Sequence, residues 1–164
     1  MKNVTLTLLA LFFLAGAAFS QVSMVSEGGK FKATFPGEYS YSEQTIDTDL
    51  GPVLMHIYMY EEGDEAAYMI SYNDYPADAF DQSLYKESLE GAKEGFTSNL
   101  GLEEEYSIDI SMLGYPGVYF KATDYDIYAT MYVIIRGNRL YQVGVLQQYY
   151  YADPSFLESF KLLE

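Results

Sequence analysis

The sequence predicts an α+β domain in which an antiparallel sheet of about seven or eight strands carries one long helix and a short C-terminal helix. Three observations support this prediction. Apolar residues recur at every second position in several stretches after residue 30, which is typical of half-buried strands. Residues 78–100 instead have the three-to-five-residue apolar spacing of a helix. Gly137-Asn138 separates two apolar runs, which indicates a tight β-hairpin.

Residues 1–20 have the features of a cleaved signal peptide. Lys2 precedes an apolar stretch from Leu6 to Leu14, and Ala18-Phe19-Ser20 provides small residues at the expected cleavage site. The stretch is shorter than the ~20 apolar residues that a membrane span requires. We therefore expect an exported protein, periplasmic or extracellular, that has no membrane anchor. Residues 21–30 are expected to form a flexible lead-in and residues 31–164 a single domain.

Charge and cysteine content exclude several functions. The chain has 24 acidic and 9 basic residues and a formal net charge of −15, which opposes binding to nucleic acid or to an anionic membrane surface. It has no cysteine, so disulfides, thiolate metal sites and thiol nucleophiles are impossible. No motif indicates a cofactor, and we expect none.

The strands are expected in the following order. Residues 31–35 alternate and end at a Pro-Gly turn, whereas residues 42–48 are polar and suit an edge strand. Residues 53–60 and 66–73 flank an acidic turn and predict a hairpin. Further strands are predicted at 106–112, 118–123, 127–136 and 139–147.

The hairpin around Gly137-Asn138 has a predicted register and two apolar faces. Ile134 is expected to face Tyr141, with Tyr132 opposite Val143 and Ile135 opposite Leu140. Since both faces are apolar, both need cover. The helix at 78–100, capped by Asp78 and ended by Gly101, is expected to cover one. A short helix after Asp153-Pro154, with Phe156, Leu157 and Phe160, is expected to cover part of the other.

Three segments of the chain resemble the PsbP-like family of small α/β/α proteins. They are Phe31 to Gly37, Gly137 to Val143 and Phe156 to Leu163. The resemblance implies the α/β/α fold and a non-catalytic accessory or binding role, as is typical of that family. It assigns no binding residue to this chain.

Three candidate sites for chemistry have plainer structural explanations. His56, the only histidine, lies within an apolar strand without a serine or cysteine partner at a recognisable spacing. Ser83 and Lys86 match a Ser-x-x-Lys pattern, but the motifs that accompany it in serine acyl-transferases are absent. Asp47 begins like a calcium loop, yet Pro52 and Tyr58 stand where an EF-hand needs glycine and glutamate. Incidental calcium binding by the acidic turns stays open.

The 18 tyrosines, in a chain without tryptophan, are the remaining candidates. Because tyrosine combines an apolar ring with a polar tip, it suits recognition surfaces as well as sheet margins. A possible contact surface consists of Tyr58, Tyr60, Tyr72, Tyr75, Tyr149, Tyr150 and Tyr151. We expect a non-enzymatic binding or accessory domain that uses this acidic, tyrosine-rich surface to contact a protein or glycan partner. The alternative is a hydrolase that works through paired carboxylates, with Asp74, Asp78 and the acidic turns as their source.

Overall fold

The computed structural model describes residues 20–48, 51–77 and 79–164. The predicted signal peptide lies outside the described residues apart from Ser20. Asp78, the expected cap of the long helix, also lies outside them. Within these ranges, neither helix is long and apolar enough to cross a bilayer.

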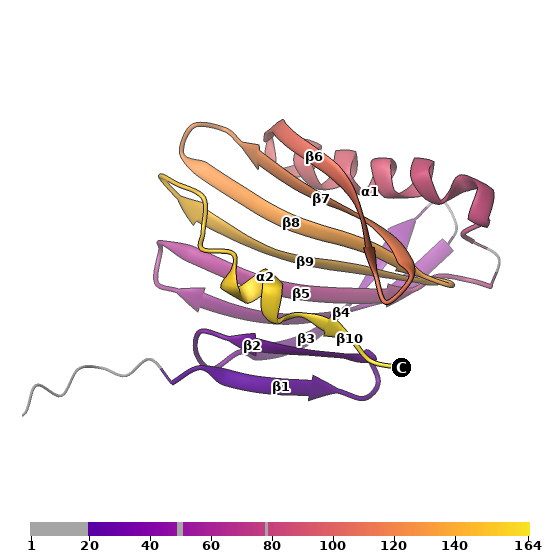
Figure 1. The fold of residues 1–164 in the computed structure, drawn as a ribbon, viewed down its shortest axis with the longest axis horizontal. Coiled ribbons are helices and arrows are strands. Elements are labelled where there is room, and N and C mark those ends of the chain that lie inside the picture. Colours follow the sequence, from indigo (N-terminus) through magenta and orange to yellow (C-terminus); the bar gives the residue numbers. More distant parts are fainter. Residues whose placement is uncertain (1–19, 49–50, 78) are drawn as a thin grey trace, which may run out of the picture.

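The described strands form two antiparallel sheets (Figure 1). The small sheet has the order β1-β2-β10, with bounds Val22–Ser26, Phe31–Phe35 and Lys161–Leu162. The large sheet has the order β3-β4-β5-β9-β8-β7-β6, so that β3 and β6 are its edges. Its strands in chain order are Ser40–Thr48, Gly51–Glu62, Ala66–Asp74, Glu103–Met112, Tyr115–Thr123, Ile127–Arg136 and Arg139–Gln148.

Two helices complete the described structure. Helix α1 spans Tyr85–Leu100 and follows a 3-10 turn at Gln82–Leu84, so it begins later than predicted. Asp81 caps that turn, since its carboxylate accepts a hydrogen bond from the Ser83 amide. Gly101, at φ 69°, ends α1 in the left-handed conformation, as predicted. Helix α2 spans Ser155–Ser159.

The expected α+β layered fold is wrong, because the protein is mainly β. Strands contain 57% of the described residues and helices 17%, and the strands are divided between a seven-stranded and a three-stranded sheet. The small sheet was not expected at all. Residues 22–26, expected within the flexible lead-in, form β1 because they pair with β2 along its whole length and bury Met24 and Ser26.

The predicted central hairpin is confirmed. In the β8–β9 pair, Ile134 faces Tyr141, Tyr132 faces Val143, and Ile135 faces Leu140. The two-residue turn at Gly137-Asn138 sets this register.

The face of the large sheet that carries Ile134, Tyr141 and Val143 packs against the small sheet and α2. Phe31 and Phe160 are fully buried in this core. The Tyr141 hydroxyl joins the two sheets, because it donates a hydrogen bond to the Gly29 carbonyl across 2.9 Å. The small sheet thus covers most of this face, and the short helix α2 covers part of the rest.

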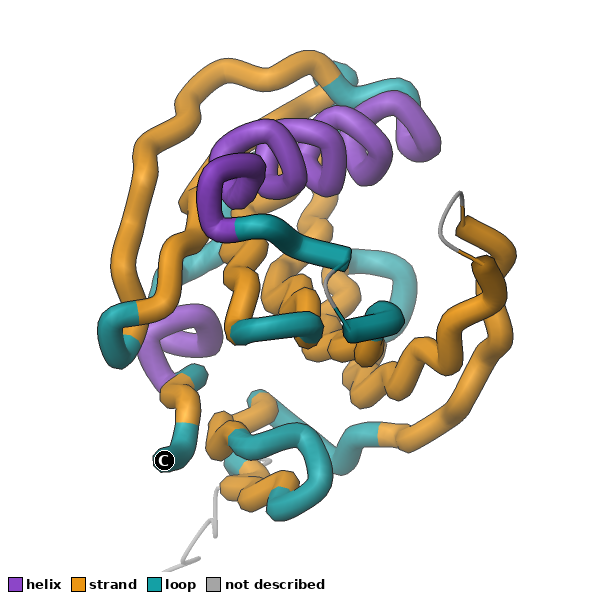
Figure 2. The backbone as a smooth tube through the Cα atoms, turned by 90° about the vertical axis from the view of Figure 1, so that its right-hand side faces the viewer, coloured by secondary structure: helices purple, strands orange, loops and turns teal. Residues whose placement is uncertain are grey.

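The opposite face of the large sheet packs against α1, and Figure 2 shows α1 and the small sheet on opposite sides of it. Leu89 of α1 is buried against this face, and Phe96 packs edge-on against Phe120 of β7. Gly91 and Gly95 lie inside α1. A Cβ atom at either position would meet nothing within 4 Å, so close packing on the sheet does not require glycine there.

Candidate functional site

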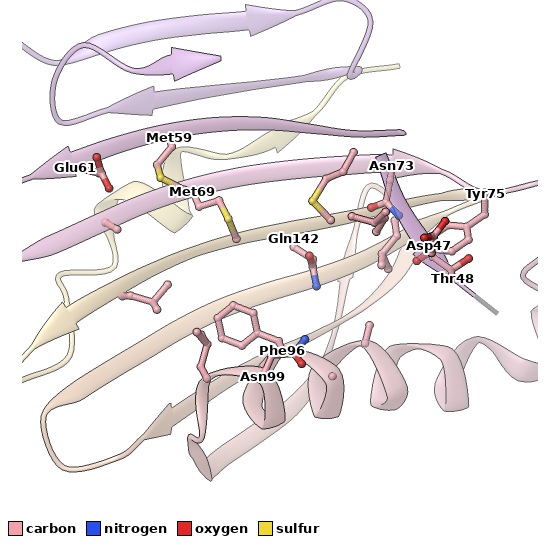
Figure 3. A pocket seen from close by; sticks show the side chains of 18 residues that line it. Asp47, Thr48, Met59, Glu61, Met69, Asn73, Tyr75, Phe96, Asn99 and Gln142 are labelled. Atoms are coloured by element: carbon pink, nitrogen blue, oxygen red, sulfur yellow. The ribbon is translucent and has the colours of Figure 1, made fainter. Parts of the chain in front are cut away.

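The candidate site is a groove between α1 and the half of the large sheet formed by β3, β4, β5 and β9 (Figure 3). Its volume is about 990 Å³. Residues from five elements and one loop line it: Ile46, Asp47, Thr48, Met55, Met59, Glu61, Ala67, Met69, Asn73, Tyr75, Ala92, Gly95, Phe96, Asn99, Leu100, Leu140, Gln142 and Leu146.

The groove exists because α1 lies to one side of the sheet. The helix contacts β7 and β8 through its buried apolar residues. Lys93 of α1, 5% exposed, holds the helix towards the β6 edge, since its Nζ lies 2.5 Å from Glu104 Oε2 and 3.4 Å from Ser107 Oγ. The sheet surface over β4 and β5 therefore has no helix packed directly on it.

The walls of the groove are mostly apolar and adaptable. Met55, Met59 and Met69 extend from β4 and β5, and all three are only partly buried. Methionine side chains are flexible and polarizable, so they adapt to ligands of different shape. Phe96 of α1 faces them across the groove (Figure 3).

Seven of the 18 lining residues have polar side chains: Asp47, Thr48, Glu61, Asn73, Tyr75, Asn99 and Gln142. Asn73 is 1% exposed, and its Oδ1 atom has no hydrogen-bond partner in the described part of the chain. Gln142 accepts one long hydrogen bond from Ser71 Oγ at 3.5 Å. The two charged lining residues, Asp47 and Glu61, lie at opposite ends of the groove (Figure 3).

The seven predicted tyrosines do not form one surface. Tyr58, Tyr60 and Tyr72 lie on the sheet face that packs against the small sheet, on the side away from the groove. Tyr72 is 5% exposed, and burial raises its pKa. These three rings contribute to the core between the sheets.

The other four tyrosines lie in three different settings. Tyr75 packs against Phe80 beside α1 and lines the groove. Tyr149 and Tyr150, 73% and 62% exposed, follow β9. Tyr151 donates a hydrogen bond to Glu105 Oε2 across 2.5 Å. Only Tyr149 and Tyr150 are thus free to form an aromatic contact surface of the predicted kind.

His56 takes part in an aromatic cluster on the sheet face opposite the groove. Its ring stacks on Tyr72 with 4.4 Å between the ring centroids. The Tyr41 hydroxyl donates a hydrogen bond to Glu43 Oε1 at 2.6 Å and lies 2.7 Å from His56 Nδ1. The hydrogen bond to the Glu43 carboxylate raises the pKa of Tyr41 above its ordinary value. This packing agrees with a structural role for the histidine.

The remaining candidates lie on the surface. Ser83 and Lys86 are exposed, and Ser83 Oγ donates to Asp81 Oδ1 rather than to a general base. Across residues 20–48, 51–77 and 79–164, no three His, Cys, Asp or Glu side chains gather closely enough to hold a metal ion.

Asp74, proposed as a source of a catalytic carboxylate, forms an ion pair. Arg139 donates two hydrogen bonds to its two carboxylate oxygens, each at 2.6 Å. The guanidinium also donates to the Gly28 carbonyl and stacks over Tyr72, 4.5 Å from the ring centroid. Asp74 therefore helps to join the small sheet to the large one.

Sequence reasoning missed the groove, although one signal pointed to it. In β4, Met55 and Met59 alternate with His56, Tyr58 and Tyr60, so a period of two places the methionines together on one face and the aromatic rings on the other. No family model, curated protein or solved structure matches this chain.

Proposed function

We propose that this protein is a binding protein that holds an elongated apolar ligand in the groove beside α1. The observation that carries the proposal is the groove itself, whose volume of about 990 Å³ and mostly apolar lining suit a small-molecule ligand. Ligand pockets typically measure ~300–1,000 Å³ and are lined mainly by apolar and aromatic side chains around a few polar groups.

The arrangement of charges favours binding over catalysis. A hydrolase that works through paired carboxylates needs two of them to converge on one bond. In this groove the two acidic residues, Asp47 and Glu61, lie at opposite ends (Figure 3). Asp74 is held by Arg139, so it is not a free base. These contacts support a non-enzymatic role, in agreement with the role that the PsbP-like resemblance implies.

Export of the protein and its PsbP-like relationship stay predictions. That the exposed Tyr149 and Tyr150 contact a protein or glycan partner also stays a prediction. The groove replaces the seven-tyrosine surface as the proposed ligand site, because Tyr72 is buried in the core between the sheets and Tyr58 and Tyr60 pack against it.

The test of the proposal is binding of N-phenyl-1-naphthylamine, an apolar dye whose fluorescence rises when it leaves water. A leucine at position 95 would project from α1 into the groove, because Gly95 lines it and has open space around its Cβ position. Gly95→Leu is therefore expected to weaken dye binding about tenfold or more by occupying the apolar volume.

Gly91→Leu is the matched control. Gly91 lies one turn earlier in α1, also has open space around its Cβ position, but does not line the groove. This variant has the same gain in helix propensity and is expected to bind the dye as the unchanged protein does. The proposal fails if the unchanged protein does not bind the dye, or if both variants bind it as tightly as the unchanged protein.

A further inference from the structure

The side chain of Asn73 is not explained by an apolar groove alone. Asn73 is 1% exposed, and its Oδ1 atom lacks a hydrogen-bond partner within the described chain. Buried polar atoms in native proteins are nearly always hydrogen-bonded, and a buried acceptor without a donor is costly. An apolar residue at this position would avoid the cost.

No side chain in the described part of the protein donates a hydrogen bond to Asn73 Oδ1. Its register partners on the two adjacent strands are Met55 of β4 and Leu140 of β9, and both also line the groove. Neither side chain has an N–H or O–H group. Asp47, Thr48 and Tyr75 lie at the same end of the groove as Asn73 (Figure 3), yet none of them donates to its Oδ1 atom. A bound molecule is therefore the natural source of a donor.

The charges of the groove restrict what that molecule is. Its charged lining residues are Asp47 and Glu61, both acidic, and its described lining contains no lysine, arginine or histidine. The whole chain has a formal net charge of −15. An anionic head group would meet this negative field and the Asn73 Oδ1 atom without a counterion, and the groove therefore disfavours it.

We propose that the groove selects uncharged apolar molecules that carry an O–H or N–H donor, and that the donor binds Asn73 Oδ1. This inference rests on the proposed function, because it names the ligand class of the same groove. Simple long-chain alcohols and amides belong to this class, whereas fatty acid anions do not.

The test is displacement of N-phenyl-1-naphthylamine by three ligands that share a linear ten-carbon chain: 1-decanol, decyl methyl ether and decanoate. We expect 1-decanol to displace the dye at a concentration about tenfold lower than the ether does, since the ether leaves Asn73 Oδ1 without a donor. The ether is the more apolar of the two, so a groove without a polar anchor would prefer it. Decanoate is expected to be the weakest competitor at pH 7.

Asn73→Leu is expected to bind the dye but to lose the preference for 1-decanol over the ether. Gln142→Leu is the matched control, because it removes an amide that lines the same groove and is expected to keep the preference. The comparison of the three ligands on the unchanged protein tests the inference even if a variant fails to fold.

Two results would overturn the inference. One is displacement by the ether at the same concentration as 1-decanol or at a lower one, and the other is a decanol preference that survives in Asn73→Leu. Both results are distinct from failure of the proposed function. In that case the unchanged protein does not bind the dye, or Gly95→Leu does not weaken dye binding.

Discussion

Replacing Asn73 with leucine is expected to stabilise the unliganded protein. At 1% exposure the amide is almost fully removed from water, and its Oδ1 atom has no partner in the described structure. An unsatisfied buried acceptor costs about 1–3 kcal/mol. Leucine has the same branching and number of side-chain heavy atoms as asparagine and would meet Met55 and Leu140 on the adjacent strands, both apolar. We therefore expect a gain of about 1–2 kcal/mol in the free energy of unfolding.

The assay is urea unfolding followed by circular dichroism. For a chain of this length, 1 kcal/mol corresponds to a change of about 2–4 °C in Tm, so thermal unfolding provides a second measurement. Asn99→Leu is the control, because Asn99 lines the groove but is exposed on α1, and its effect is expected to stay within about 0.5 kcal/mol. A loss of 1 kcal/mol or more in Asn73→Leu would refute the reasoning, since it would show that the amide is already satisfied in the folded protein.

Three further predictions concern the scaffold. Arg139→Lys is expected to cost about 2 kcal/mol in thermal unfolding, because a lysine ammonium lacks the planar fork that forms two parallel hydrogen bonds with Asp74; a cost below 0.5 kcal/mol would contradict this. Gly144→Ala places its Cβ against the buried Met131 thioether and is expected to cost about 1–3 kcal/mol; an unchanged urea midpoint would count against it. Burial raises the pKa of Tyr68 from 10.0 to about 12, so its contribution to stability is complete below pH 10 and is lost as the pH rises towards 12. Unfolding measured from pH 8 to 11 checks this, and a free energy that does not fall above pH 10 would refute it.

Local signals in the sequence predicted local structure well. The register of the β8–β9 hairpin follows from a two-residue turn between alternating strands, and both depend on residues close in the chain. Gly101 marked the end of α1 for the same reason, because only the conformation of that residue is involved. Helix α1 begins later than predicted, since a 3-10 turn capped by Asp81 precedes it.

The fold class was mispredicted because the small sheet depends on pairing over long distances. Strand β10 has two residues, too few to give a pattern, and pairs with β2 about 130 residues earlier in the chain. Strand β1 has only five residues, two of them serine, and the glycines at 28 and 29 follow it, so the segment resembles a loop. Its burial follows from pairing with β2, which no local pattern reports.

The groove was beyond sequence reasoning because it depends on where α1 lies over the sheet. That position reflects the contacts of Lys93 with Glu104 and of Phe96 with Phe120, which join distant parts of the chain. The distribution of the tyrosines was accessible in part. A period of two along β4 places Tyr58 and Tyr60 on one face, but which face receives the small sheet is decided by the tertiary fold.

The two outermost strands of the large sheet leave backbone donors and acceptors open along their rims, where another molecule could add a strand. Both strands carry acidic side chains, of which Glu104 is paired with Lys93 of α1. Strand β3 carries Glu43 and Asp47, β6 carries Glu103, Glu104 and Asp109 among its acids, and neither strand has a lysine or arginine. At neutral pH, repulsion between the acidic residues of two copies therefore disfavours pairing of these edge strands.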